Sequence, residues 1–217
     1  MKYFLDTANI SQIKEAKELG IIDGVTTNPS LMAKEGIKGI KNQHNHYMKI
    51  CEIVSGDVSA EVISTDYNGI LEEGISLSKL HPNIVVKVPM IKAGLKAISK
   101  LSSMKIKTNC TLVFSPGQAL LAAKAGATYI SPFLGRLDDI STDSLSLISD
   151  IQKIYSNYNF STQILAASIR HPMHIIQCAL IGVDVVTCPF DVILKLLNHP
   201  LTDIGLKKFL DDYQKIR

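Results

Sequence analysis

Apolar and polar positions alternate along this chain in two periods that follow each other from one end to the other. Short apolar runs rich in β-branched residues are typical of buried strands. Between them, apolar residues recur at helical spacing, as at Ile91, Leu95, Ile98 and Leu101. The pattern predicts eight strands, at 2–6, 24–27, 58–63, 84–88, 106–111, 128–131, 163–167 and 184–187.

Helix starts between these strands carry recognisable signals. Asn9 with Gln12, and Ser115 with Gln118, have the form of capping boxes, and Pro116 stands at a first helical position. Strands that alternate with helices predict the α/β class, and eight such units predict a (β/α)8 TIM barrel with an additional C-terminal helix. The alternative is a doubly wound open sheet, although no glycine-rich nucleotide motif follows any strand. No linker interrupts 1–217, which predicts a single domain.

Composition narrows the choice of environment and partners. With 46% apolar and 20% charged residues and a net charge of +3, the chain is typical of a soluble domain without a nucleic-acid surface. No signal-like segment stands at the start, and no stretch approaches the roughly 18 apolar residues of a membrane span. The four cysteines form no CxxC and have no regular spacing, which favours a reducing cytoplasm.

Lys87 is the first candidate for chemistry because it lies inside the apolar run at 84–89. Burial disfavours the charged form of a lysine, and a neutral amine attacks carbonyl carbons to form a Schiff base. The alternative is a lysine that extends past the strand end to reach solvent.

Polar residues follow at nearly every strand end, and such ends converge on one pocket in a barrel. Taken singly, each has an ordinary explanation. Asp6 could cap a helix, Glu61 could face solvent or pair with a helix lysine, and Arg136 and Arg170 could be surface arginines. Their occurrence at seven strand ends of one pattern favours a shared site. The strand-end residues are Asp6, Thr26, Asn28, Glu61, Lys87, Asn109, Thr111, Ser131, Phe133, Arg136, Ser168 and Arg170.

Five runs in this pattern resemble the transaldolase family, and within it the small subfamily that also contains fructose-6-phosphate aldolase. They are FLDT at 4–7, GVTTNPSL at 24–31, VVKVP at 85–89, SPFLGR at 131–136 and LAASIR at 165–170. The resemblance implies a TIM barrel that transfers a dihydroxyacetone unit between sugar phosphates through a Schiff base. It implies neither a metal nor another cofactor.

The resemblance also implies roles for individual residues. Lys87 would form the imine, and Asp6 would be the general acid/base at the C4 hydroxyl. Glu61 and Thr111 would handle the water of imine formation and hydrolysis. The substrate-binding residues would be Thr26, Ser131 and Phe133, with Asn28 and Asn109 on the dihydroxyacetone hydroxyls and Arg136, Ser168 and Arg170 on the phosphate.

The resembling subfamily contains two activities. Its aldolases tend to carry glutamine where Glu61 stands and tyrosine where Phe133 stands, so both positions favour a transaldolase. Fructose-6-phosphate aldolase is the alternative, and a non-catalytic sugar-phosphate binding barrel is a further one that the presence of Lys87 disfavours. The pairs His44/His46 and His171/His174 lack the further ligands that a metal site needs.

The last segment, at about 200–217, continues past the eighth helix with an apolar stripe at Ile204, Phe209, Leu210 and Tyr213. Such a helix usually docks on something. In the small transaldolases that the chain resembles, it reaches a neighbouring subunit in pentamers and decamers. A homo-oligomer of that kind is expected, with docking on its own barrel as the alternative.

Overall fold

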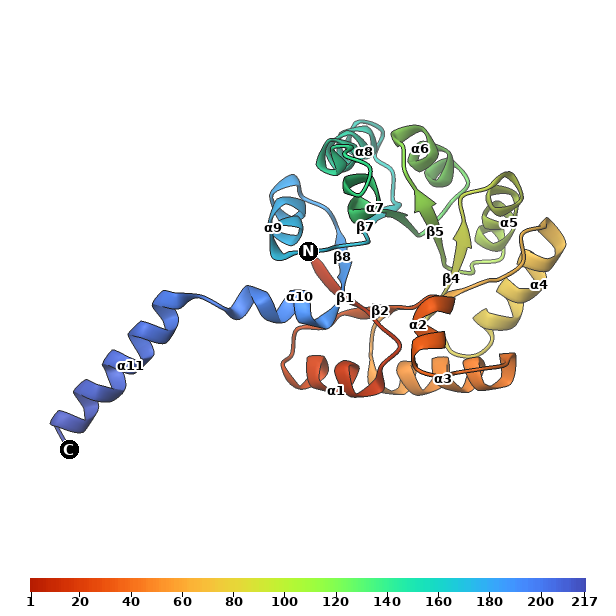
Figure 1. Ribbon diagram of the computed structural model, residues 1–217. Helices are drawn as coiled ribbons and strands as arrows, with labels where there is room; N and C mark the ends of the chain where they lie inside the picture. Colours follow the sequence, from red (N-terminus) through yellow and green to blue (C-terminus); the bar gives the residue numbers. More distant parts are fainter.

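The computed structural model describes all 217 residues, and its centre is a closed barrel of eight parallel strands in chain order (Figure 1). All eight predicted strands are present, and their ends differ from the prediction by about two residues or fewer. The predicted TIM barrel is therefore confirmed, and the open sheet is excluded because β1 pairs with β8. The strands are β1 (Lys2–Asp6), β2 (Gly24–Thr26), β3 (Val58–Glu61), β4 (Ile84–Pro89), β5 (Thr108–Val113), β6 (Tyr129–Pro132), β7 (Gln163–Ala166) and β8 (Val185–Cys188).

Helices form a ring around the barrel, and their inward faces pack against the outside of the strands in one core of 45 buried residues. None of them combines the length and the apolar character needed to cross a membrane. They are α1 (Ile10–Glu18), α2 (Pro29–Lys34), α3 (Ile40–Ile53), α4 (Tyr67–Ser78), α5 (Lys92–Ser103), α6 (Pro116–Lys124), α7 (Leu134–Asp138), α8 (Ser144–Tyr158), α9 (Pro172–Ile181), α10 (Phe190–Leu194), the 3-10 turn η1 (Lys195–Leu197) and α11 (Pro200–Lys215).

The expected caps are present, although each is only half of a capping box. Asn9 accepts a hydrogen bond from the backbone N–H of Gln12, and Ser115 accepts one from that of Gln118. The reciprocal bond is absent at α1 because the Gln12 side chain accepts the hydroxyl of Thr7 instead. Thr7 thereby connects the end of β1 to the first turn of α1.

The barrel interior is built in two layers that follow from the two-residue period of a strand. The lower layer is apolar, and its rings Phe4 and Tyr129 meet edge to face with their centroids 6.0 Å apart. Gly24 lies beside Phe4 in the sheet and leaves room for its ring, because a Cβ at Gly24 would lie 2.5 Å from the ring. Two residues further along their strands, the upper layer is largely polar. The pairs are Phe4 and Asp6, Val85 and Lys87, Tyr129 and Ser131, and Val185 and Thr187.

Helix α11 extends away from the barrel, and none of its residues is buried (Figure 1). Its apolar side chains face solvent, and Phe209 is 72% exposed. Packing on its own barrel is therefore not observed. The other exposed apolar residues of this helix are Leu201, Ile204, Leu206, Leu210 and Tyr213.

Candidate active site

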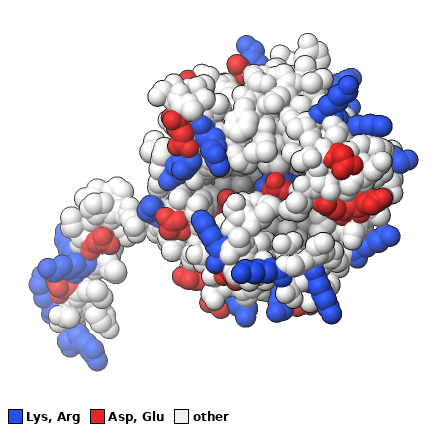
Figure 2. Space-filling view, turned by 45° about the vertical axis from the view of Figure 1, so that its right-hand side comes forward, with Lys and Arg blue, Asp and Glu red and all other residues white.

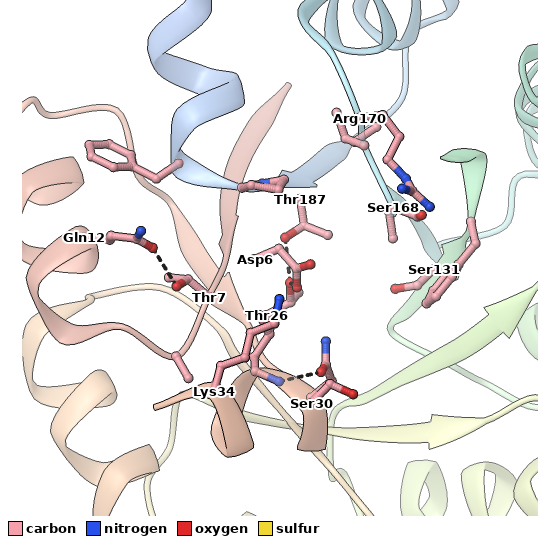
Figure 3. A pocket seen from close by; sticks show the side chains of 18 of the residues that line it. Asp6, Thr7, Gln12, Thr26, Ser30, Lys34, Ser131, Ser168, Arg170 and Thr187 are labelled. Atoms are coloured by element: carbon pink, nitrogen blue, oxygen red, sulfur yellow. Dashed lines mark hydrogen bonds between the residues drawn. The ribbon is translucent and has the colours of Figure 1, made fainter. Parts of the chain in front are cut away.

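A cavity of about 540 Å³ opens at the C-terminal ends of the barrel strands. The corresponding face of the molecule is hollowed, and charges of both signs are scattered around the hollow (Figure 2). Ser131, Ser168 and Arg170 group on one side of the cavity, while Thr7 and Gln12 lie on the other (Figure 3). The expected site residues that line it are Asp6, Thr26, Asn28, Lys87, Ser131, Phe133, Arg136, Ser168 and Arg170.

Lys87 and Glu61 form an ion pair at the base of this site. The two residues are direct neighbours in the β3–β4 register, and the Lys87 Nζ lies 3.0 Å from the Glu61 Oε2. Lys87 is 5% exposed and also donates to the backbone carbonyl of Thr27 at 3.2 Å. Lys87 therefore points into the barrel rather than past the strand end.

Asp6 is the other acidic group in the upper layer, and two threonines connect it to β8. The Thr26 hydroxyl donates to the Asp6 Oδ1 at 2.8 Å, and the Thr26 and Thr187 hydroxyl oxygens are 2.6 Å apart. Because Thr26 has one hydrogen to give, Thr187 is the donor to Thr26. Burial raises the pKa of Asp6, and the nearby Lys87 ammonium and the Thr26 hydroxyl offset part of that rise. Asp6 does not cap α1, since Asn9 does.

Asn109 and Thr111 extend from β5 but do not line the cavity. Asn109 is fully buried, with its amide donating to Ser59 at 3.2 Å and accepting from the Ser131 hydroxyl at 2.8 Å. Thr111 is also buried, and its hydroxyl has no hydrogen-bond partner in the protein. β5 is irregular just after these positions, where Leu112 has a left-handed φ of 62°.

Phe133 and Asn28 close two other parts of the wall. Phe133 packs edge to face on Phe114, with their ring centroids 5.7 Å apart, and presents an apolar surface to the cavity. Asn28 caps α2 by accepting from the backbone N–H of Leu31 at 3.0 Å. Its side-chain oxygen is thus engaged in the cap, while its amide hydrogens remain available to a ligand.

Arg136 and Arg170 stand at the rim, on α7 and on the loop from β7 to α9. Both are exposed, and the Arg170 Nη2 lies 2.8 Å from the Asp139 Oδ2. The two segments are joined by backbone bonds, including one from the Gly135 N–H to the Ser168 carbonyl at 2.9 Å. Ser168 has a left-handed φ of 58°, a conformation that surrounding contacts must maintain.

Several lining residues were not expected from the sequence, among them Thr187, Gln12, Ser30 and Lys34. A signal for Thr187 existed, because β8 also ends in a polar residue two positions after an apolar one. Lys34 and Ser30 lie inside helix α2, where no strand-end rule identifies them.

One histidine of each pair makes a polar contact with another group of the protein. The His46 Nε2 contacts the backbone carbonyl of Ala8 at 2.7 Å, and the His174 Nε2 lies 2.8 Å from the Asp138 Oδ2. No group of three His, Cys, Asp or Glu side chains is arranged to hold a metal ion.

Fold and site together define a (β/α)8 barrel with a buried lysine paired to a half-buried glutamate, a half-buried aspartate and a rim of two arginines. The chain belongs to the transaldolase/fructose-6-phosphate aldolase family, a family of enzymes whose model matches residues 3–217. It is 67% identical over 216 residues to a protein of Cytophaga hutchinsonii named "Probable transaldolase", covering 100% of this chain and 99% of that one. A Phocaeicola vulgatus protein of the same name is 65% identical, with the same coverage.

A solved structure supports the fold alone. Thiamine phosphate pyrophosphorylase from Pyrococcus furiosus superposes with a TM-score of 0.63 at 12% sequence identity, covering 87% of this chain and 85% of that one.

Proposed function

We propose that this protein is a transaldolase of the pentose phosphate pathway. It transfers a dihydroxyacetone unit between sugar phosphates, converting sedoheptulose 7-phosphate and glyceraldehyde 3-phosphate into erythrose 4-phosphate and fructose 6-phosphate. The observation that carries the proposal is the buried Lys87, which lines a cavity beside Asp6 with arginines at its rim and lies 3.0 Å from the Glu61 carboxylate. The relatives named "Probable transaldolase" support the same reaction.

Lys87 is the nucleophile in this reaction. Its amine attacks the ketose C2 carbonyl after giving a proton to Glu61, which lies within direct transfer distance. The carbinolamine then loses its hydroxyl as water, with Glu61 returning the proton, to leave a protonated imine. Thr111 offers a buried hydroxyl without a protein partner, which is suited to hold that water.

Asp6 is the general base for carbon–carbon cleavage. It takes the proton from the C4 hydroxyl while the electrons of the C3–C4 bond move toward the imine, and the aldehyde departs. The raised pKa that burial gives Asp6 makes it a stronger base than an exposed carboxylate. In the second half of the reaction the bound carbanion attacks the new aldehyde, and Asp6 returns its proton to the nascent alkoxide.

The remaining residues orient the sugar. Arg136, Ser168 and Arg170 bind the phosphate, and guanidinium groups suit this role because their fork matches two phosphate oxygens. Arg170 would exchange or share its contact with Asp139 when phosphate binds. Asn28 donates to a hydroxyl of the dihydroxyacetone unit.

Ser131, Asn109, Thr26 and Phe133 complete the substrate-binding set. Ser131 lines the cavity, and its hydrogen bond to Asn109 orients its hydroxyl. Asn109 itself would reach a hydroxyl only by exchanging that bond. Thr26 acts through its bond to Asp6, and Phe133 supplies an apolar wall.

Phe133 favours transfer over simple cleavage. Release of free dihydroxyacetone requires a proton on the carbanion, and a phenyl ring has none to give. The fructose-6-phosphate aldolase reaction remains the alternative, and the presence of Glu61 together with Phe133 argues against it.

The nucleophile is tested by trapping. We expect borohydride reduction in the presence of fructose 6-phosphate to attach a dihydroxyacetone-derived group to the peptide that contains Lys87. Lys87→Met should lose the adduct, whereas Lys92→Met should keep it because Lys92 is an exposed lysine at the start of α5. An adduct on another lysine, or none, would contradict the Schiff-base reaction.

The protein is also proposed to form a pentamer or a decamer through α11. The exposed apolar side chains of this helix support that assembly. A mostly apolar cavity of about 430 Å³ beside β1, α1 and η1 offers a receiving surface for α11 of a second copy; Tyr3, Leu19, Ile193 and Leu197 line part of it. The four buried, unpaired cysteines suit a reducing cytoplasm.

A further inference from the structure

His174 is a buried histidine whose two ring nitrogens both have protein partners. It lies in the first turn of α9, and its side chain is 5% exposed. The Arg170 backbone N–H donates to its Nδ1 at 3.3 Å. Its Nε2 lies 2.8 Å from the Asp138 Oδ2. These partners require the neutral tautomer that carries its hydrogen on Nε2.

The two partners belong to the two segments that carry the rim arginines. Asp138 is the last residue of α7, two positions after Arg136, and Arg170 lies two positions after Ser168 in the loop from β7 to α9. The inner ends of these segments are held by backbone bonds from Leu134 to Ala167 and from Gly135 to Ser168. His174 bridges their outer ends.

We propose that neutral His174 is a positioning residue for phosphate binding: it fixes the backbone of Arg170 against α7 so that Arg170 and Arg136 converge on one phosphate. The inference rests on the proposed role of these arginines. Without His174, the Arg170 N–H would lose its acceptor, and the loop would be tied to α7 only by its inner bonds and by the exposed Arg170–Asp139 pair.

The charges around His174 determine when it is neutral. Burial lowers its pKa, and the His171 ring, 3.8 Å away between centroids, and Arg170 lower it further. Asp138 has the opposite effect. Protonation of Nδ1 would remove the acceptor of the Arg170 N–H. We therefore expect binding of sugar phosphate to weaken on acidification in a way that requires His174.

Two amide replacements separate the two ring nitrogens. In His174→Asn the side-chain oxygen lies near the position of Nδ1 and still accepts from Arg170. In His174→Gln the amide nitrogen lies near the position of Nε2 and keeps only the contact with Asp138. His171→Asn is the matched control, because His171 is exposed and its side chain makes no hydrogen bond in the cap of α9.

The measurements are kcat and KM with erythrose 4-phosphate and with unphosphorylated erythrose as acceptor, and competitive inhibition by inorganic phosphate. For His174→Gln we expect roughly tenfold increases in KM for erythrose 4-phosphate and in the phosphate inhibition constant, the factor that follows from one lost buried hydrogen bond. Kinetics with erythrose should be unchanged. His174→Asn should stay within about twofold of the wild type, as one preserved hydrogen bond implies.

The pH profile adds a readout that does not depend on a destabilised variant. Because the pKa of His174 is lowered from 6.5, its protonation falls below that pH. Between about pH 6.5 and pH 5, KM for erythrose 4-phosphate should rise more in the wild type than in His174→Asn, while ionisation of the phosphate itself affects both alike. Identical profiles would overturn the inference, as would equal losses on both acceptors in His174→Gln.

Arg136→Ala and Arg170→Ala distinguish this failure from a failure of the proposed function. If these variants weaken only the phosphorylated acceptor and His174→Gln does not, the inference about His174 alone is wrong. If neither arginine variant distinguishes the two acceptors, phosphate binding at this rim is wrong, and the inference falls with it.

Discussion

Gly135→Ala tests how rigidly α7 and the loop from β7 to α9, the two segments that carry the rim arginines, are held together. A Cβ built on Gly135 would lie 2.3 Å from the Arg170 Nε and 2.4 Å from the Ser168 carbonyl oxygen. Ordinary contacts between heavy atoms begin near 3.5 Å, so the added methyl requires a displacement of roughly 1 Å. The Ser168 carbonyl cannot yield freely, because the Gly135 N–H is bonded to it at 2.9 Å.

The expected cost has two parts. Overfilling a packed contact destabilises a protein by about 1–3 kcal/mol, from which the helical advantage of alanine over glycine, about 0.5–1 kcal/mol, is subtracted. The functional cost is larger, since a misplacement of about 1 Å can lower a rate about 100-fold. We expect kcat/KM for erythrose 4-phosphate to fall by that order and kcat/KM for unphosphorylated erythrose to change by less than about twofold.

Gly117→Ala is the matched control. Gly117 also lies near the start of a helix, α6, but a Cβ there would meet only the Ser115 hydroxyl oxygen, at 4.0 Å. This variant should gain about 0.5–1 kcal/mol in free energy of unfolding and keep the kinetics of the wild type. Urea unfolding at the same pH measures the first expectation, and steady-state kinetics with both acceptors the second.

Two outcomes for Gly135→Ala would refute the reasoning. Unchanged kcat/KM with erythrose 4-phosphate would mean that the loop moves aside without consequence for phosphate binding. An equal loss with both acceptors would mean that the methyl disturbs the barrel as a whole rather than the position of Arg170.

Three further outcomes are expected. Phe133→Tyr should raise the ratio of fructose 6-phosphate cleavage to transfer, because the new hydroxyl can protonate the bound carbanion; an unchanged ratio would remove Phe133 from the choice between reactions. Asp6→Asn should abolish transfer yet raise the free energy of unfolding measured in urea, and the gain should be larger near pH 8 than near pH 5. The reason is that the folded-state pKa of Asp6 is raised above the unfolded value of 3.8, so its ionised carboxylate becomes unfavourable to folding as pH rises. A gain independent of pH would contradict that account. Removal of residues 200–217 should give a smaller assembly in sedimentation. The barrel should stay folded, because no residue of α11 is buried. If the number of subunits in the assembly did not change, the subunits would associate through another surface.

The fold was predictable because most strands combine an apolar run, which identifies the strand, with a polar residue near its end, which identifies its inward face. Fully buried strands such as β4 are apolar runs, interrupted there only by Lys87, and a polar residue at or near the strand end indicates the face that turns inward. Lys87, Asn109 and Ser131 are all buried inside the barrel. Strand ends are harder to place, because a strand stops where its neighbour stops pairing and not where its own sequence changes.

Contacts between particular side chains could not be predicted from the sequence, because they depend on how the strands pair and on how the barrel closes. The alternation of side chains along β3 indicates that Glu61 faces inward, but its ion pair with Lys87 depends on the register of β3 against β4. The contact between Thr26 and Thr187 arises from closure of the barrel, which brings together residues 161 positions apart. His174 shows no signal at all, because its partners lie on a helix and a loop whose positions only the folded structure sets.

The distribution of charge in the cavity gives the substrate a direction. At its base, Lys87 and Asp6 line the cavity and Glu61 pairs with Lys87 from outside the lining, so the three groups carry a net charge of about −1 when all are ionised. At the rim, Arg136 makes no ion pair within 4.0 Å, and Arg170 is half exposed beside a single aspartate. A phosphate dianion is therefore repelled from the base and attracted to the rim. In the proposed reaction the uncharged keto end would then be the end that reaches Lys87, so the electrostatic gradient that would favour a phosphorylated sugar would also present its carbonyl carbon to the amine.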